Sequence, residues 1–203
     1  MKRKAGERMK GKNTGKTIVS MVLICVVLVG FYFLLNQKEN EGGKKKTETN
    51  TEAQLLLQKD YDRNYPATVR EVVNQYARIS QCLYNEDVSE EEFDGLVLLM
   101  RKLYDEELLE ANPPETARIK LKAEVSSAKE NKYYMYRYQV QKLSSVKYWT
   151  AEEDELASIV VCITMNNDGT MEKSYEEFLL REDANERWKI VGWRLTNAVD
   201  MSD

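Results

Sequence analysis

The residues that could carry out chemistry in this chain are mainly carboxylates and tyrosines. No histidine is present among the 203 residues, which excludes Ser-His-Asp and Cys-His nucleophile pairs and removes the commonest metal ligand. The predicted strands offer Glu172, Glu176 and Glu177 as acids or bases, with tyrosines as partners. Their spacing singles out none of them, so we expect no enzymatic activity and no catalytic residue. An enclosed cavity with Glu176 or Glu177 buried among tyrosines would overturn that expectation.

Cysteines and acidic clusters give no sign of a metal site or a cofactor. Cys25, Cys82 and Cys162 lie far apart and form no Cys-x-x-Cys pattern. Helical angle and strand parity place Cys82 and Cys162 on surfaces that do not face each other, so we expect two separate thiols. The clusters "SEEEFD", "YDEELLE" and "AEEDE" lack the glycine and spacing of a calcium-binding loop, and they suit helix starts and solvated faces.

Aromatic residues are the other candidates for a site. Trp188 and Trp193 lie five residues apart near the end of the chain, and a regular strand would point them to opposite faces unless a bulge realigns them. Because aromatics dominate cores and interfaces without any ligand, we favour core or interface over a ligand pocket. The candidate pocket or interface residues are Tyr134, Tyr136, Tyr138, Trp149, Trp188 and Trp193.

The first 35 residues predict a membrane anchor. Residues 1–16 carry seven Lys or Arg and one Glu, and residues 17–35 are nineteen residues without a charge. At about 1.5 Å per residue, these nineteen cover most of a ~30 Å hydrocarbon core. The missing small-residue cleavage site argues against a removed signal peptide. The positive-inside bias then predicts a single-pass protein that contacts the lipid bilayer through residues 17–35, with the basic tail in the cytoplasm and the C-terminal domain outside.

The segment after the predicted span is polar. Residues 36–60 predict a flexible linker, although "AQLLLQKD" within it could begin a helix. Residues 36–203 carry 23 basic and 33 acidic side chains. Because such an acidic body repels phosphate backbones, we expect no binding to nucleic acid.

Helical patterns occupy the first half of the folded domain, which we expect to span residues 61–203. Apolar residues at helical spacing from Val69 to Leu83 predict one helix, with Pro66 in its first turn. A second helix is predicted from "SEEEFDGLVLLMRKLYDEELLE", where Ser89 and Glu92 have the spacing of a capping box. The segment "ETARIKLKAEVSSAKENK" is ambiguous between helix and strand, and we favour a third helix.

From residue 132 onward the period changes to two, which is typical of strands. Four runs are predicted, with an Asp-Gly hairpin turn in "NNDGT". The apolar parity shifts between Tyr175 and Phe178 and again between Ile190 and Val191, and such shifts indicate bulges that bend a sheet. The sequence therefore predicts an α+β domain, with two or three helices packed on one face of a curved antiparallel sheet of about four strands.

This order of elements, ending in "YEEFLLREDANERWKIVGW", resembles the nuclear-transport-factor-2-like (NTF2-like) superfamily of cone-shaped domains. More narrowly, "NYPATVREVV", "CLYNED", "LYDEELLEANPP" and "WKIVGW" are similar to an uncharacterised family of bacterial single-pass membrane proteins. That family often has proline where this chain has Val69, a departure that affects only the helix start. The resemblance implies a cone that often holds a pocket between sheet and helices. It supplies no activity and no catalytic residues.

Three functions from different classes fit these observations. The first, which we favour, is a non-catalytic, membrane-tethered interaction or assembly module with an unknown protein partner or a second copy of itself. Its layout is similar to that of scaffold components of bacterial conjugation machines. The second is a small-ligand binder using the cone, and the third is a lyase or isomerase of the same fold. They require an exposed apolar patch, a closed apolar cavity, and a carboxylate with a raised pKa inside that cavity, respectively.

Overall fold

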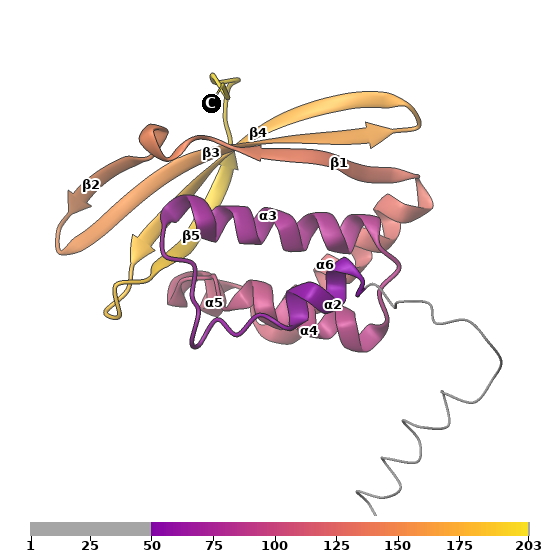
Figure 1. The fold of residues 1–203 in the computed structure, drawn as a ribbon, viewed down its shortest axis with the longest axis horizontal. Coiled ribbons are helices and arrows are strands. Elements are labelled where there is room, and N and C mark those ends of the chain that lie inside the picture. The colour runs from indigo at the N-terminus through magenta and orange to yellow at the C-terminus, as the bar shows by residue number, and fades with distance from the viewer. Residues whose placement is uncertain (1–49, 203) are drawn as a thin grey trace, which may run out of the picture. The chain divides into compact units, whose positions relative to one another are not determined.

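The computed structural model describes residues 50–202, which form helices followed by a sheet (Figure 1). This confirms the α+β class, with five described helices where two or three were expected. The basic tail and the predicted span at residues 17–35 lie outside the described residues. Within residues 50–202, no helix is long and apolar enough to cross a bilayer. The helices are α2 (Glu52–Leu57), α3 (Val69–Asn85), α4 (Glu90–Arg101), α5 (Glu106–Ala111) and α6 (Pro114–Glu130).

The sheet is antiparallel throughout and has the order β1-β3-β4-β5, with β2 also paired to β3. The hairpin between β3 and β4 turns at Asp168 and Gly169, both at positive φ, as the Asp-Gly signal predicted. The sheet has five strands where about four were predicted, because the sequence pattern does not indicate β2. The strands are β1 (Tyr133–Val140), β2 (Lys147–Ala151), β3 (Asp154–Asn167), β4 (Thr170–Glu182) and β5 (Trp188–Leu195).

The five described α-helices lie on one face of the sheet, with α3 directly beneath the strands (Figure 1). The other face is crossed by the C-terminal segment, since Gln139 Nε2 donates to the Met201 carbonyl at 2.5 Å. Val160 and Cys162, which point to that outer face, are buried. The sheet is therefore covered on both sides, but only the helical side carries the main core.

Helix starts follow the capping signals in the sequence. The Ser89–Glu92 capping box is formed at the start of α4 and confirms that prediction. A second box, between Thr68 and Glu71, begins α3. Pro66 lies before this cap rather than in the first turn, so its predicted place in the helix was wrong.

The second predicted helix is broken after Arg101. The chain there leaves the helix to pair with β5, where Ile190 N donates to Leu103 O at 2.8 Å and Asp105 N donates to Ile190 O at 2.9 Å. The side chain of Asp105 then accepts a hydrogen bond from Glu107 N and caps α5. The hydrogen bonds to β5 and the new cap at Asp105 together stabilise this break more than continuation of the helix would.

The end of the predicted linker belongs to the folded domain. Helix α2 has the helical conformation suggested by "AQLLLQKD", and Ala53 and Leu56 are buried in the core. Leu57 packs so closely over α4 that a Cβ at Gly95 would lie 2.7 Å from its Cδ2. The packed chain therefore begins at α2, earlier than the expected boundary at residue 61.

The bulges that bend the sheet are partly those expected. Leu179 pairs with Gly192 and Leu180 with Ile190, so Val191 is an extra residue in β5, as predicted. Pairing of β3 with β4 is continuous past Tyr175, so the bulge predicted in β4 was wrong. An unpredicted register shift lies in β1 between Met135 and Arg137.

The two cysteines among residues 50–202 are both buried and unbonded. This confirms that Cys82 and Cys162 are separate thiols. Cys82 packs in the helical core, whereas Cys162 lies on the outer face of β3. Burial raises the pKa of the Cys82 thiol to about 12. Such a thiol is protonated and unreactive at neutral pH.

Candidate functional site

A cavity of about 330 Å³ lies between the sheet and helices α3, α4 and α6. Its sheet side is formed by Val161 and Ile163 of β3 and by Glu176 and Phe178 of β4. Glu176 and Phe178 are two residues apart on a regular strand and therefore share the helical face. We call this sheet side the floor of the cavity. It is apolar except for the carboxylate of Glu176.

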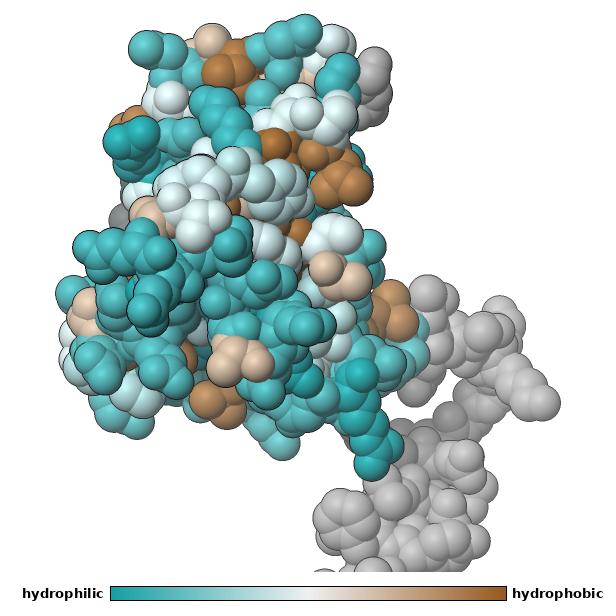
Figure 2. Space-filling view, turned by 90° about the vertical axis from the view of Figure 1, so that its left-hand side faces the viewer, coloured by the Kyte–Doolittle hydropathy of each residue, from teal (hydrophilic) through white to brown (hydrophobic). Residues whose placement is uncertain are grey.

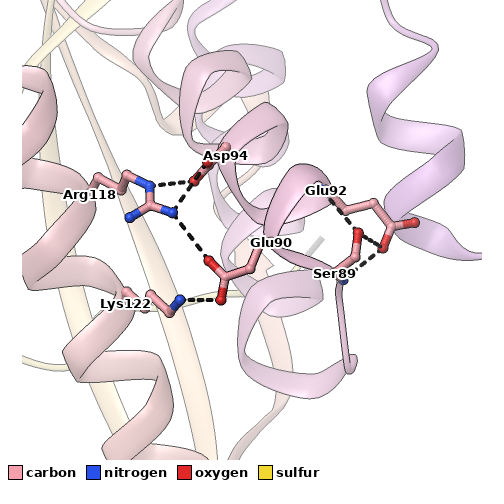
Figure 3. A network of polar contacts seen from close by, with 6 residues as sticks. All are labelled: Ser89, Glu90, Glu92, Asp94, Arg118 and Lys122. Carbon is pink, nitrogen blue, oxygen red and sulfur yellow. Dashed lines mark hydrogen bonds and ion pairs between the residues drawn. The ribbon is translucent and has the colours of Figure 1, made fainter.

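Helix α6 forms one wall of the cavity and is held to α4 by charged side chains (Figure 3). Arg118 donates to Asp94 through Nε at 2.5 Å and through Nη2 at 3.2 Å, and its Nη2 also reaches Glu90 at 3.1 Å. Lys122, one turn further along α6, pairs with Glu90 as well. Val125 and Ala128 of α6 are buried and Leu121 packs against the core, so these partly exposed ion pairs add to apolar packing in positioning this wall.

Four aromatic rings cluster at one end of the cavity. Trp193 stacks on Phe178 with ring centroids 5.5 Å apart and an interplanar angle of 20°. The ring of Tyr76 lies 5.2 Å from both Phe178 and Trp193, and Tyr104 lies 6.3 Å from Tyr76 and from Trp193. Trp193 remains 41% exposed. It therefore forms part of the cavity rim rather than the centre of the core.

The carboxylate of Glu176 is the main unpaired charge in the cavity. Within residues 50–202 its side chain has neither a hydrogen-bond partner nor an ion-pair partner, and it is half-buried. Burial raises its pKa above the ordinary value of 4.5, and the charge of Glu124 adds to the increase. The neighbouring Glu177 points to the outer face, where Arg194 Nη2 donates to it at 2.8 Å and lowers its pKa.

Several other polar groups of the cavity are engaged with the protein. Tyr84 donates its hydroxyl to Glu124, and Arg101 donates to the carbonyl of Asn112 at 2.7 Å. Lys120 lines the cavity from α6 and is exposed. Burial raises the pKa of the Tyr104 phenol to about 12, so it is a neutral hydroxyl at physiological pH.

The six aromatic candidates do not form one site. Only Trp193 lines the cavity. Tyr138 and Trp188 are half-buried against the core, with Trp188 5.6 Å from Tyr148. The bulge at Val191 places Trp188 and Trp193 on one face, because they pair with Glu182 and Phe178, an even number of residues apart. The exposed members are Tyr134, Tyr136 and Trp149.

The tyrosines that do line the cavity come from α3 and from the segment after α4. Tyr76 and Tyr84 lie on α3, and Tyr104 lies in the segment that pairs with β5. Tyr76 and Tyr104 occur in the apolar stripes of the predicted helices, a position that indicates core packing rather than a site. Their polar hydroxyls at otherwise aliphatic positions were the signal available in the sequence.

Within the described part of the chain, no group of three or more acidic or cysteine side chains is placed to hold a metal ion. Residues 1–193 match a family described as "Domain of unknown function (DUF6715)". The chain belongs to this family. No curated protein matches it. The DUF6715 match begins at the basic tail and includes every cavity residue named above.

We expect Glu176→Gln to make this DUF6715 protein more stable at neutral pH. Because the folded-state pKa of Glu176 is raised, the native state holds the proton more tightly than the unfolded state does. Wild-type stability therefore falls as pH rises from about the ordinary pKa of 4.5 through the raised value. The glutamine variant avoids this cost, so its melting temperature should exceed that of the wild type at pH 7 and approach it at pH 4.

Glu177→Gln is the matched control, one residue away on the same strand. Its folded-state pKa is lowered by Arg194, so its contribution to stability is present at neutral pH and lost as pH falls. The two variants should therefore shift the melting temperature at pH 7 in opposite directions, as followed by circular dichroism. A lower melting temperature for Glu176→Gln at pH 7 would contradict the interpretation that burial of the Glu176 carboxylate lowers stability.

Proposed function

We propose that this protein is a membrane-tethered, NTF2-like domain that binds a small, partly apolar molecule between its helices and its sheet. The cavity of about 330 Å³ carries the proposal. Ligand pockets usually measure about 300–1,000 Å³ and combine apolar walls with a few placed polar groups. A dry cavity of about 150 Å³ already accepts benzene. The space here suits a ligand with a single ring or a short chain.

The tether remains part of this proposal. Residues 1–16 supply the basic cytoplasmic tail, and residues 17–35 supply the membrane span that leaves the domain outside the cytoplasm. The family match from residue 1 supports treating these segments and the domain as one unit. The order of helices before a bent antiparallel sheet supports the NTF2-like assignment.

Protein interaction is the second candidate, and exposed aromatics on two edge strands favour it. Tyr134 and Tyr136 on β1 and Trp149 on β2 are each at least 40% exposed. However, the face drawn in Figure 2 is mainly hydrophilic, with hydrophobic residues in small separate groups. Large contiguous apolar patches are what mark stable interfaces. This face shows no such patch, whereas the cavity has a defined lining, so we place binding in the cavity above the interaction function favoured by the sequence.

The expectation that the domain lacks catalytic activity stays a prediction. Glu176 shares a cavity with Tyr76, Tyr84 and Tyr104, but its side chain is only half-buried and the cavity is open at Trp193. A raised carboxylate pKa is a common property of general acids and bases. We propose binding because the cavity alone suffices for it.

Filling the cavity from α6 tests this function. Ala117 lines the cavity, whereas Thr116 beside it is exposed. We expect small aromatic fragments to give saturation-transfer NMR signals with the full-length wild type in detergent, against a blank of empty micelles. Ala117→Trp should abolish these signals because the indole occupies the space, while Thr116→Trp should preserve them. Fragments that bind equally well to Ala117→Trp, or no fragment binding to the wild type, would contradict the proposal.

A further inference from the structure

The charge balance of the cavity constrains its ligand. Of the two lining carboxylates, Glu124 accepts the hydroxyl of Tyr84, while Glu176 has no partner among residues 50–202. The two lining cations, Arg101 and Lys120, both belong to the helical side: Arg101 ends α4 and keeps its charge while donating to the Asn112 carbonyl, and Lys120 is an exposed residue of α6. A desolvated carboxylate without a counter-ion is unfavourable unless it is protonated or paired. The floor of the cavity therefore lacks a positive charge.

The aromatic cluster lies on the same side of the sheet as this carboxylate. Phe178 is two residues from Glu176 on β4 and stacks on Trp193, and the rings of Tyr76 and Tyr104 complete the cluster. Aromatic faces attract cations through the ring quadrupole, most strongly when water is excluded. The carboxylate and the aromatic rings therefore both favour a positively charged ligand.

We infer that the ligand is an organic ammonium ion with a small apolar body, its cationic group next to Glu176 and the aromatic cluster. This inference rests on the proposed binding function and adds the chemical class. A carboxylate ligand placed against the sheet side of the cavity would meet Glu176 as a like charge, because the two lining cations, Arg101 and Lys120, belong to the helices. A neutral ligand would leave Glu176 to be neutralised by a proton. The ammonium ion satisfies the carboxylate and uses the ring faces together.

Three probes with one common body test the charge. Benzyltrimethylammonium, benzyl alcohol and benzoate share the benzyl or phenyl group and differ in charge, and each is titrated calorimetrically into the full-length protein in detergent at pH 7. We expect the ammonium probe to bind at least about tenfold more tightly than the alcohol, and benzoate to bind most weakly. Because this probe is permanently charged, its affinity should fall as pH falls through the raised pKa of Glu176.

Glu176→Gln separates this inference from general cavity binding. We expect the variant to lose about tenfold or more in affinity for benzyltrimethylammonium and to keep its affinity for benzyl alcohol. Glu177→Gln, on the outer face and paired with Arg194, should bind all three probes as the wild type does. Circular dichroism at each pH shows that the variants are folded.

The outcomes distinguish the two proposals. If the alcohol binds as tightly as the ammonium probe and Glu176→Gln changes neither, the cavity binds ligands but the ammonium inference fails. Tightest binding of benzoate would also refute the inference and assign recognition to Arg101 and Lys120, the two cations that line the cavity. If none of the probes or fragments binds the wild type, the proposed function itself fails.

Discussion

Replacing Phe178 by alanine is expected to lower the free energy of unfolding by about 3–5 kcal/mol, the usual cost of deleting a buried phenyl ring. Phe178 is 1% exposed and lies at the centre of the sheet face. Its ring contacts Tyr76 edge-on at 5.2 Å and stacks on Trp193 at 5.5 Å. The truncation removes apolar burial and two aromatic contacts, and rigid neighbours cannot fill the space. Urea unfolding followed by far-ultraviolet circular dichroism measures the loss.

Leu195 offers a control near Phe178. It lies on β5, opposite Glu176, and is 76% exposed. Leu195→Ala should therefore change stability by no more than about 0.5 kcal/mol. A loss below about 1 kcal/mol for Phe178→Ala would mean that the site collapses around the missing ring. The aromatic cluster would then not be the rigid wall on which the ammonium inference depends.

The helices were predictable because local signals agree with the core there. The stripe from Val69 to Leu83 is buried in α3 as expected, and the capping box at Ser89 begins α4. Strand β2 was missed because it is short, fully exposed and bounded by a turn without glycine, with Glu152 at positive φ. No apolar periodicity marks such a strand, and only its pairing with β3 defines it.

Apolar parity identified one bulge and failed at another for a physical reason. At Val191 the parity shift reflects a true extra residue, and it brings both tryptophans to one face. At Tyr175 the shift has a different origin, because that side chain lies on the outer face, where its partner in β3 is the buried Cys162. A strand covered on both faces carries apolar residues at both parities, so parity alone cannot indicate a bulge there.

The cavity could be predicted only in part from the sequence. Glu176 was among the acids considered, but its isolation depends on Glu177 being turned outward and paired with Arg194. Tyr104 reaches the cavity because the chain leaves α4 after Arg101 and pairs with Ile190. Both features depend on contacts between residues distant in sequence. Local periodicity, which predicted one continuous helix here, contains no information about them.

The segment that carries Tyr104 is fixed by a buried ion pair. Arg181 on β4 binds the carboxylate of Asp105 through two nitrogens, Nη2 at 2.8 Å and Nε at 3.2 Å. Asp105 is only 9% exposed, and it also caps α5. Two further carboxylates, Glu107 at 2.9 Å and Asp154 at 3.0 Å, complete the surroundings of the guanidinium. One side chain therefore joins the helix start to the sheet.

Asp105→Ala is expected to lower the free energy of unfolding by about 2–4 kcal/mol, because breaking a buried pair costs about 3–5 kcal/mol and a lost cap about 1, offset by the remaining partners of Arg181. Glu107→Ala, which removes an exposed partner of the same guanidinium, should cost less than about 1 kcal/mol. Urea unfolding compares the two. Equal losses would show that Asp105 contributes no more to stability than the exposed Glu107 does.

The ion pair also positions the cavity wall, because Tyr104 directly precedes Asp105. We therefore expect Asp105→Ala to weaken benzyltrimethylammonium binding, while Glu107→Ala should leave it unchanged.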